Sequence, residues 1–131
     1  MPSTNKRRIL VVIGTRPEGI KLAPLILRMR EAAGLEVETC VSAQHRQMLD
    51  PVLEFFGIRP DYDLDIMRPD QKLEEVTSSV LRGVAGVLER ARPRWTVVQG
   101  DTTTTFAAAL ASFYARVPVA HVEAGLRTGD P

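Results

Sequence analysis

The sequence predicts an α/β fold built on an open, mostly parallel, doubly wound (Rossmann-like) sheet. Four short runs of apolar, β-branched residues alternate along the chain with longer stretches of helical character. The first, third and fourth runs are nearly continuous rather than alternating, which is typical of parallel strands buried on both faces. We therefore expect strands at residues 9–13, 37–41, 95–98 and 117–122.

Helices are expected between these strands, and local signals mark their ends. Thr15 and Glu18 stand at capping-box spacing before the first helix, and Gly34 is a favourable stop for it. Pro24 removes a helix hydrogen bond and is expected to kink or split that helix. Asp101 is a natural N-cap for the last helix. The helices are expected at 17–33, 45–56, 72–91 and 102–115, while 61–67 is either a short edge strand or a loop.

Length and composition indicate one domain and give no support to a nucleic-acid or membrane partner. The 131 residues are 44% hydrophobic and 25% charged, as is ordinary for a globular domain, and the formal net charge is only +1. The apolar run after the basic residues 6–8 is too short for a signal peptide or a membrane span. One cysteine, Cys40, and two distant histidines offer neither a disulfide nor a metal site. We expect a cytoplasmic protein that needs no cofactor.

Polar residues collect where the predicted strands end, while the middles of the strands are apolar. Ligands of open α/β sheets bind beyond the carboxyl ends of the strands, so this asymmetry predicts a ligand cleft. The residues concerned are Thr15, Arg16 and Lys21 after the first strand, Ser42, Gln44, His45 and Arg46 after the second, residues 99–105 after the third, and His121 and Glu123 at the end of the fourth.

The segment from Gly14 to Lys21 predicts an anion site. It places Arg16 and Lys21 at a helix start, where the helix dipole already contributes about half a positive charge. Cations at such a place suit a bound phosphate better than they suit helix stability. The glycine spacing of residues 14–19 resembles a P-loop, but the lysine is offset by one residue and Pro17 removes a backbone N–H from the cradle. We reject the P-loop; two solvated charges remain the alternative.

Two carboxylates each have two interpretations. Asp101 serves either as the helix N-cap or as a side chain facing the cleft, since Gly100 lets a ligand approach the backbone closely. Glu123 follows a predicted buried strand, so it belongs either to a structural ion pair, for instance with Arg127, or to the site. For His121, a hydrogen-bonded histidine of the core is the favoured interpretation.

The assembled motifs resemble the bacterial non-hydrolysing UDP-N-acetylglucosamine 2-epimerase family. They follow one another in the order of that family from about residue 8 to the end of the chain, and Pro17 with Glu18 favours the non-hydrolysing branch. The motifs are Gly14-Thr-Arg-Pro-Glu-Gly-Ile-Lys-Leu-Ala-Pro-Leu25, Ala43-Gln-His-Arg-Gln-Met-Leu-Asp50, Asp61-Tyr-Asp-Leu-Asp-Ile-Met67, Gly100-Asp-Thr-Thr-Thr-Thr105 and His121-Val-Glu-Ala-Gly-Leu-Arg-Thr-Gly-Asp130.

The resemblance implies a GT-B-like fold of two Rossmann-like domains with the UDP-sugar held between them. Residues 1–131 would be the incomplete N-terminal domain, and the C-terminal UDP-binding domain would lie outside this chain. The reaction inverts C2 of UDP-GlcNAc to give UDP-ManNAc through elimination and re-addition of UDP, as a step in cell-surface polysaccharide biosynthesis. No nicotinamide is required, and full-length members are expected to form homodimers.

The resemblance also assigns roles to particular residues. Arg16 and Lys21 match substrate-binding residues beside the phosphates of the nucleotide. Asp101 and Glu123 match acidic residues implicated in proton transfer at C2 and in holding the sugar. Gln44 and Gln47 match a region where some members bind a second UDP-GlcNAc as an allosteric activator.

Since family members are more than twice as long, we expect this chain to be inactive when alone. The alternative is a non-catalytic remnant that binds UDP-sugar, or a half-domain that depends on a partner. A GT-B glycosyltransferase is disfavoured by the motifs beginning at Gly14 and Gly100.

Overall fold

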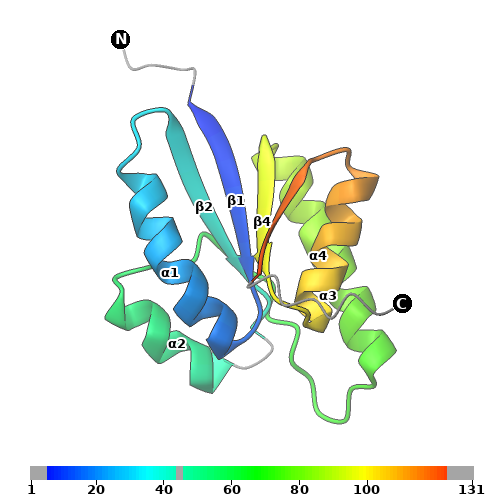
Figure 1. Ribbon diagram of the computed structural model, residues 1–131. Helices are drawn as coiled ribbons and strands as arrows, with labels where there is room; N and C mark the ends of the chain where they lie inside the picture. Colours follow the sequence, from blue (N-terminus) through cyan, green and yellow to red (C-terminus); the bar gives the residue numbers. More distant parts are fainter. Residues whose placement is uncertain (1–5, 44–45, 124–131) are drawn as a thin grey trace, which may run out of the picture.

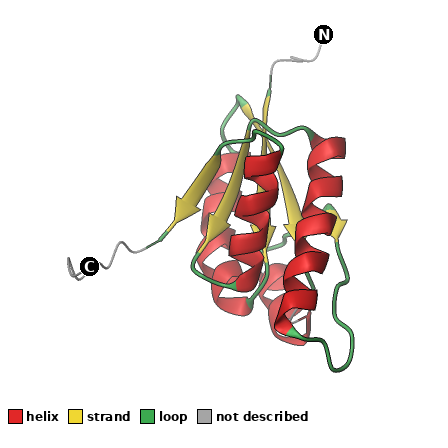
Figure 2. Cartoon of the chain, turned by 90° about the vertical axis from the view of Figure 1, so that its right-hand side faces the viewer, coloured by secondary structure: helices red, strands yellow, loops and turns green. Residues whose placement is uncertain are grey.

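The computed structural model describes residues 6–43 and 46–123 and contains a five-stranded sheet flanked by helices (Figure 1). Every pair of neighbouring strands is parallel, and the order across the sheet is β3-β2-β1-β4-β5. Figure 2 shows the arrowheads of the strands pointing the same way. The elements are β1 (Arg7–Ile13), α1 (Arg16–Arg30), β2 (Leu35–Val41), α2 (Arg46–Phe55), β3 (Tyr62–Asp63), α3 (Leu73–Ala91), β4 (Trp95–Gln99), α4 (Thr103–Tyr114) and β5 (Val119–Val122).

The helices cover the two faces of the sheet in pairs. In Figure 1, α1 and α2 lie on one face and α3 and α4 on the other, and each pair has its own apolar core. Leu10 and Val12 of β1 point into the core under α3 and α4, while Val11 and Ile13 point into the core under α1 and α2. The central strand is therefore buried on both faces, as its continuous apolar run predicts. The predicted parallel, doubly wound sheet is confirmed.

Two expectations about single elements need correction. Of the two outcomes expected for Pro24, a kink or a split, the split does not occur, because α1 runs unbroken through it. Pro24 and Ile20, whose carbonyl loses its N–H partner, are both exposed, so water can reach that carbonyl, and Leu22 and Ile26 anchor the other face. The fourth predicted strand is not buried on both faces, because β5 is the edge of the described sheet and none of its residues is fully buried.

The capping box and the ambiguous segment are resolved by the structure. Thr15 is the N-cap of α1, and the Glu18 carboxylate accepts the Thr15 backbone N–H at 3.1 Å, so the predicted box is confirmed. Residues 61–67 contain both alternatives, since Tyr62 and Asp63 pair with the end of β2 and the remainder is loop. Among the helices of residues 6–43 and 46–123, none is long and apolar enough to cross a membrane.

Cys40 gives a probe of global unfolding. Its side chain is fully buried, and burial, reinforced by the charge of Asp63, raises the pKa of the thiol to about 12 from 9.0. We expect negligible alkylation by iodoacetamide at pH 8 in the folded chain and rapid alkylation in denaturant. Because the folded pKa is the higher one, the thiol stabilises the fold below pH 9 and loses that contribution as the pH rises towards 12. Equal alkylation rates with and without denaturant would contradict the burial of Cys40.

Candidate active site

The candidate site lies at the carboxyl edge of the sheet, where the strand order reverses between β1 and β4. From this point the chain winds outwards in both directions, through β2 and β3 on one side and through β5 on the other. Such a switch point leaves a crevice between the loops that follow the two central strands. The β1–α1 turn (residues 14–15) and the β4–α4 turn (residues 100–102) form its two sides.

Glu18 occupies the N-terminal end of α1 with its own carboxylate. The side chain is only 2% exposed. Oε1 accepts the Gly14 backbone N–H at 3.0 Å, and Oε2 accepts the Thr15 backbone N–H at 3.1 Å and the Thr15 hydroxyl at 2.6 Å. Oε2 also accepts the Thr102 hydroxyl at 3.0 Å, from the opposite side of the crevice. A buried carboxylate is tolerated when its oxygens are satisfied in this way.

The threonines of residues 102–105 build the floor of the crevice. Thr102 is the N-cap of α4 and accepts the Thr105 backbone N–H at 3.3 Å. The Thr105 hydroxyl donates to the Gln99 carbonyl at 2.7 Å. The Thr104 hydroxyl donates to the Ser42 hydroxyl at 3.2 Å, which ties α4 to the end of β2. The loops that follow β1, β2 and β4 are thus held together by buried or partly buried hydroxyl groups and one carboxylate.

The structure corrects the expectation that Asp101 caps the last helix, because Thr102 is the cap. Gly100 has φ of +82°, a conformation that favours glycine, and it turns the chain so that Asp101 projects from the turn. The Asp101 side chain is exposed, and with the described part of the chain it forms no hydrogen bond or ion pair. Its carboxylate is therefore available to a ligand in the crevice.

Arg16 and Lys21 are both exposed on α1, but they lie on different flanks of the helix. Five residues correspond to about 140° around the axis. The Lys21 flank adjoins Glu18, which faces the β4–α4 turn, whereas the Arg16 flank faces α2. The predicted pair of cations is therefore spread across the crevice mouth rather than gathered into one cluster.

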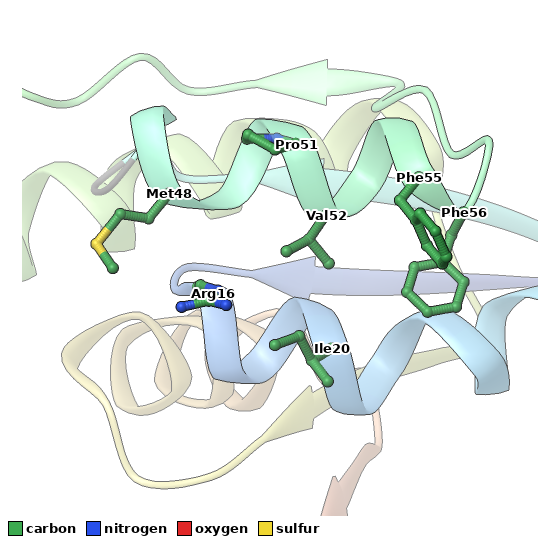
Figure 3. A pocket seen from close by; sticks show the side chains of 7 residues that line it. All are labelled: Arg16, Ile20, Met48, Pro51, Val52, Phe55 and Phe56. Atoms are coloured by element: carbon green, nitrogen blue, oxygen red, sulfur yellow. The ribbon is translucent and has the colours of Figure 1, made fainter.

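Arg16 stands at the end of an apolar groove between α1 and α2 (Figure 3). The groove has a volume of about 440 Å³. Figure 3 shows Arg16 and Ile20 on one wall and the α2 side chains on the other. The lining residues are Arg16, Ile20, Met48, Pro51, Val52, Phe55 and Phe56.

The end of β5 brings two more of the predicted site residues to this edge. Glu123 is exposed and follows the last residue of that strand, at the same edge as Asp101. Because β5 is the edge of the described sheet, Glu123 does not follow a strand buried on both faces, contrary to expectation, and Arg127 lies outside the described residues. His121 is exposed, contrary to the favoured interpretation as a core residue, and its Nε2 lies 2.6 Å from the Gly100 carbonyl. This contact joins β5 to the β4–α4 turn.

Of the two allosteric candidates, the structure describes one, at the start of α2. Gln44 is outside the described residues, and Gln47 is exposed on the first turn of the helix. Beside it, Arg46 donates to Asp63 at 2.8 and 3.1 Å and to Asp65 at 3.1 Å. The hydrogen bond from Asp63 raises the pKa of Arg46 above its usual value. The start of α2 is thereby fixed to the loop after β3.

Some residues of this site are not evident from the sequence as functional residues. Glu18 is recognisable only as half of a capping box, and its bond to Thr102 spans 84 positions. The run of four threonines is the one signal for the hydroxyl floor. In residues 6–43 and 46–123 there is no group of three or more His, Cys, Asp or Glu side chains that could hold a metal ion.

Comparison with known proteins agrees with the motifs. A family model described as UDP-N-acetylglucosamine 2-epimerase matches residues 27–131. The chain is 58% identical over 123 residues to the UDP-N-acetylglucosamine 2-epimerase of Yersinia pestis and 54% identical over 123 residues to that of Escherichia coli (strain K12), in each case covering 94% of this chain and 33% of the relative.

A solved structure of UDP-GlcNAc 2-epimerase from Neisseria meningitidis bound to UDP-GlcNAc superposes with a TM-score of 0.86 at 51% identity. The superposition covers 94% of this chain and 34% of that one. This chain therefore spans about a third of the length of the relatives it matches. With the family model matching more than half of its residues, the chain belongs to the UDP-N-acetylglucosamine 2-epimerase family.

Proposed function

We propose that this chain forms one wall of the catalytic cleft of a UDP-N-acetylglucosamine 2-epimerase. The enzyme inverts C2 of UDP-GlcNAc to give UDP-ManNAc by eliminating UDP and adding it back after the proton has been replaced on the other face. The observation that carries this proposal is Asp101, an exposed carboxylate at the switch point of the sheet that has no partner among residues 6–43 and 46–123. A carboxylate in such a place can exchange a proton with a bound sugar.

The other site residues have separate roles along the crevice. Arg16 and Lys21 neutralise the diphosphate as it departs, from the two flanks of α1. Glu123 holds the sugar or takes part in proton transfer, at the neighbouring strand end. The mechanism needs no cofactor, because the only bonds changed are C–H and C–O bonds of the substrate. Gln44 and Gln47 belong to a second, regulatory UDP-GlcNAc site in this proposal.

The proposal includes a second domain outside residues 1–131, which grips the uridine in a GT-B-like arrangement. A chain that spans a third of its relatives supplies one side of the cleft, so we expect no epimerisation by this chain alone. A cytoplasmic location and a role in cell-surface polysaccharide biosynthesis complete the proposal. The single cysteine, Cys40, agrees with a reducing compartment.

A chimera tests the activity directly. The matched third of the Escherichia coli relative is replaced by residues 1–131, and the product is incubated with UDP-GlcNAc in D₂O. We expect NMR to show that the chimera incorporates solvent deuterium at C2 and that the isolated chain incorporates none. A folded chimera without incorporation would contradict the assignment, and incorporation by the isolated chain would contradict the need for a second domain.

Arg16→Ala should weaken UDP binding to the chimera by about tenfold or more. The expected loss follows because a charge-assisted contact to phosphate contributes about 1.5–3 kcal/mol. Isothermal titration calorimetry measures the change, and Arg28→Ala serves as the control because Arg28 is exposed on the last turn of the same helix. Equal UDP affinities for the Arg16 variant and the parent would contradict the phosphate contact and show that Arg16 is a solvated charge.

A homodimer is also proposed, with the outer face of α4 as its contact surface. This helix has apolar residues on its outer side as well as its inner side: Ala107, Ala108 and Ala111 are buried, yet Phe113 and Tyr114 are 74% and 67% exposed. A helix with apolar residues on every side is normally covered on every side. Phe113→Ser should shift the chimera from dimer to monomer in multi-angle light scattering. An unchanged molar mass would contradict the outer face of α4 as the dimer contact surface.

A further inference from the structure

We propose that Glu18 is the positioning residue of the site, an internal anion that joins the two turns flanking the crevice. Among the buried side chains of the described residues, Glu18 carries the one carboxylate, and Cys40 is the one other ionisable group. It accepts two backbone N–H groups from the β1–α1 turn and one hydroxyl from the β4–α4 turn. The part of this inference that concerns catalysis rests on the proposed function.

The first consequence is that several backbone N–H groups around the start of α1 are already bonded within the chain and are not available to an external phosphate. The Gly14 and Thr15 N–H groups donate to Glu18, Pro17 has no N–H, and the Gly19 N–H donates to the Thr15 carbonyl at 3.0 Å. These are the groups that a P-loop would turn towards a nucleotide. We therefore expect the phosphates to be bound mainly by the side chains of Arg16 and Lys21 rather than by a backbone cradle.

The second consequence concerns alignment across the crevice. Thr102 directly follows Asp101, and Glu18 lies two residues after Arg16. The hydrogen bond from the Thr102 hydroxyl to Glu18 Oε2 therefore links the segment that carries Asp101 to the segment that carries Arg16. The Thr15 hydroxyl and the Thr102 hydroxyl meet at this same oxygen. Loss of this link frees the two turns to move apart, and misplacement of a reacting group by about 1 Å can lower a rate about 100-fold.

A formate titration of the 131-residue chain tests the internal anion without any assay of activity. In Glu18→Ala, the vacated donors can accept a small carboxylate. We expect sodium formate, but not sodium chloride at the same concentration, to shift the Gly14 and Thr15 amide signals saturably in ¹⁵N NMR spectra. The parent chain and Glu31→Ala, which removes an exposed carboxylate at the end of the same helix, should show no such shift. A folded Glu18→Ala variant whose Gly14 and Thr15 amide signals do not shift with formate would overturn the proposal.

Variants of Thr102 in the chimera test the alignment. Thr102→Val removes the hydroxyl and should lower kcat about tenfold or more while KM changes less than about threefold. Thr102→Ser keeps the hydroxyl and should retain the rate of the parent. Combining Thr102→Val with Glu18→Gln should lower kcat no further than the more severe single variant does, because both break the same link.

Each outcome decides one of the two claims. Independent, multiplicative losses in the double variant, or an unchanged kcat in Thr102→Val, would overturn the positioning role. If Glu18→Ala does not fold, the Thr102 series decides alone. If the parent chimera does not epimerise, the proposed function fails, and the formate titration still decides whether Glu18 is the internal anion of α1.

Discussion

Replacing Gly14 by alanine should destabilise the fold by about 3 kcal/mol or more. A Cβ on this buried residue would stand 2.5 Å from the Thr104 Cβ, closer than such atoms approach one another. Thr104 cannot withdraw easily, since it is fully buried on α4 and hydrogen-bonded to Ser42. Overpacking of this kind costs about 1–3 kcal/mol and more where the neighbours are rigid. Urea denaturation followed by circular dichroism measures the change.

The same chemical change at another glycine should have the opposite sign. Gly86 lies within α3, has nothing within 4 Å of its would-be Cβ, and has no positive φ. Gly86→Ala should therefore stabilise the chain by up to about 1 kcal/mol, through helix propensity alone. In Gly14→Ala, adding Thr104→Gly removes the clashing atoms and should recover part of the loss. A Gly14→Ala variant as stable as the parent would show that β1 and α4 are not in close contact.

The comparison of Gly14 and Gly86 illustrates what the sequence could predict. The apolar runs of β1 and β4 and the turns after them are local signals, and they suffice for the order of elements and for a site at the carboxyl edge. The need for glycine at position 14 comes from Thr104, which is 90 positions away in the sequence. No local pattern contains that contact.

Asp101 and Glu18 show the same limit at the site. Asp101 and Thr102 are both good N-caps, and propensity alone cannot choose between neighbours. In the structure Gly100 has a positive φ, Thr102 stands at the start of α4 as its N-cap, and Asp101 lies outside the helix. Glu18 was readable as a cap of its own helix, whereas its bond to Thr102 depends on the pairing of β1 with β4.

The expected split of the first helix at Pro24 and the expected core position of His121 were wrong for a related reason. The local cost of a proline within a helix is real, but exposure of Ile20 and burial of Leu22 and Ile26 offset it. His121 lies in an apolar run, and its run suggests a core position only if another element covers β5. In the described residues β5 has a neighbour on one side only.

Asp101→Asn should lower kcat of the chimera by about 10²–10⁴-fold while leaving stability unchanged. The amide keeps the size of the side chain but cannot take up a proton, which is the range expected for loss of a general acid or base. Deuterium incorporation at C2 should fall in parallel with the rate of UDP-ManNAc formation. UDP affinity should stay within about threefold of the parent, because Arg16 and Lys21 remain. Glu89→Gln, on the exposed face of α3, is the control.

The stability measurement separates the chemical role of Asp101 from a structural one. Because Thr102 caps α4, Thr102→Ala should cost about 1 kcal/mol of unfolding free energy, whereas Asp101→Ala should cost almost none. If the two losses were reversed, Asp101 would be the cap and its effect on the rate would follow from a disordered turn. If Asp101→Asn kept the parent rate, the proton transfer would belong to another carboxylate, and Glu123 would be the next to substitute. A large loss of kcat without loss of stability, together with an unchanged affinity for UDP, is the result expected of a side chain that acts on the substrate itself.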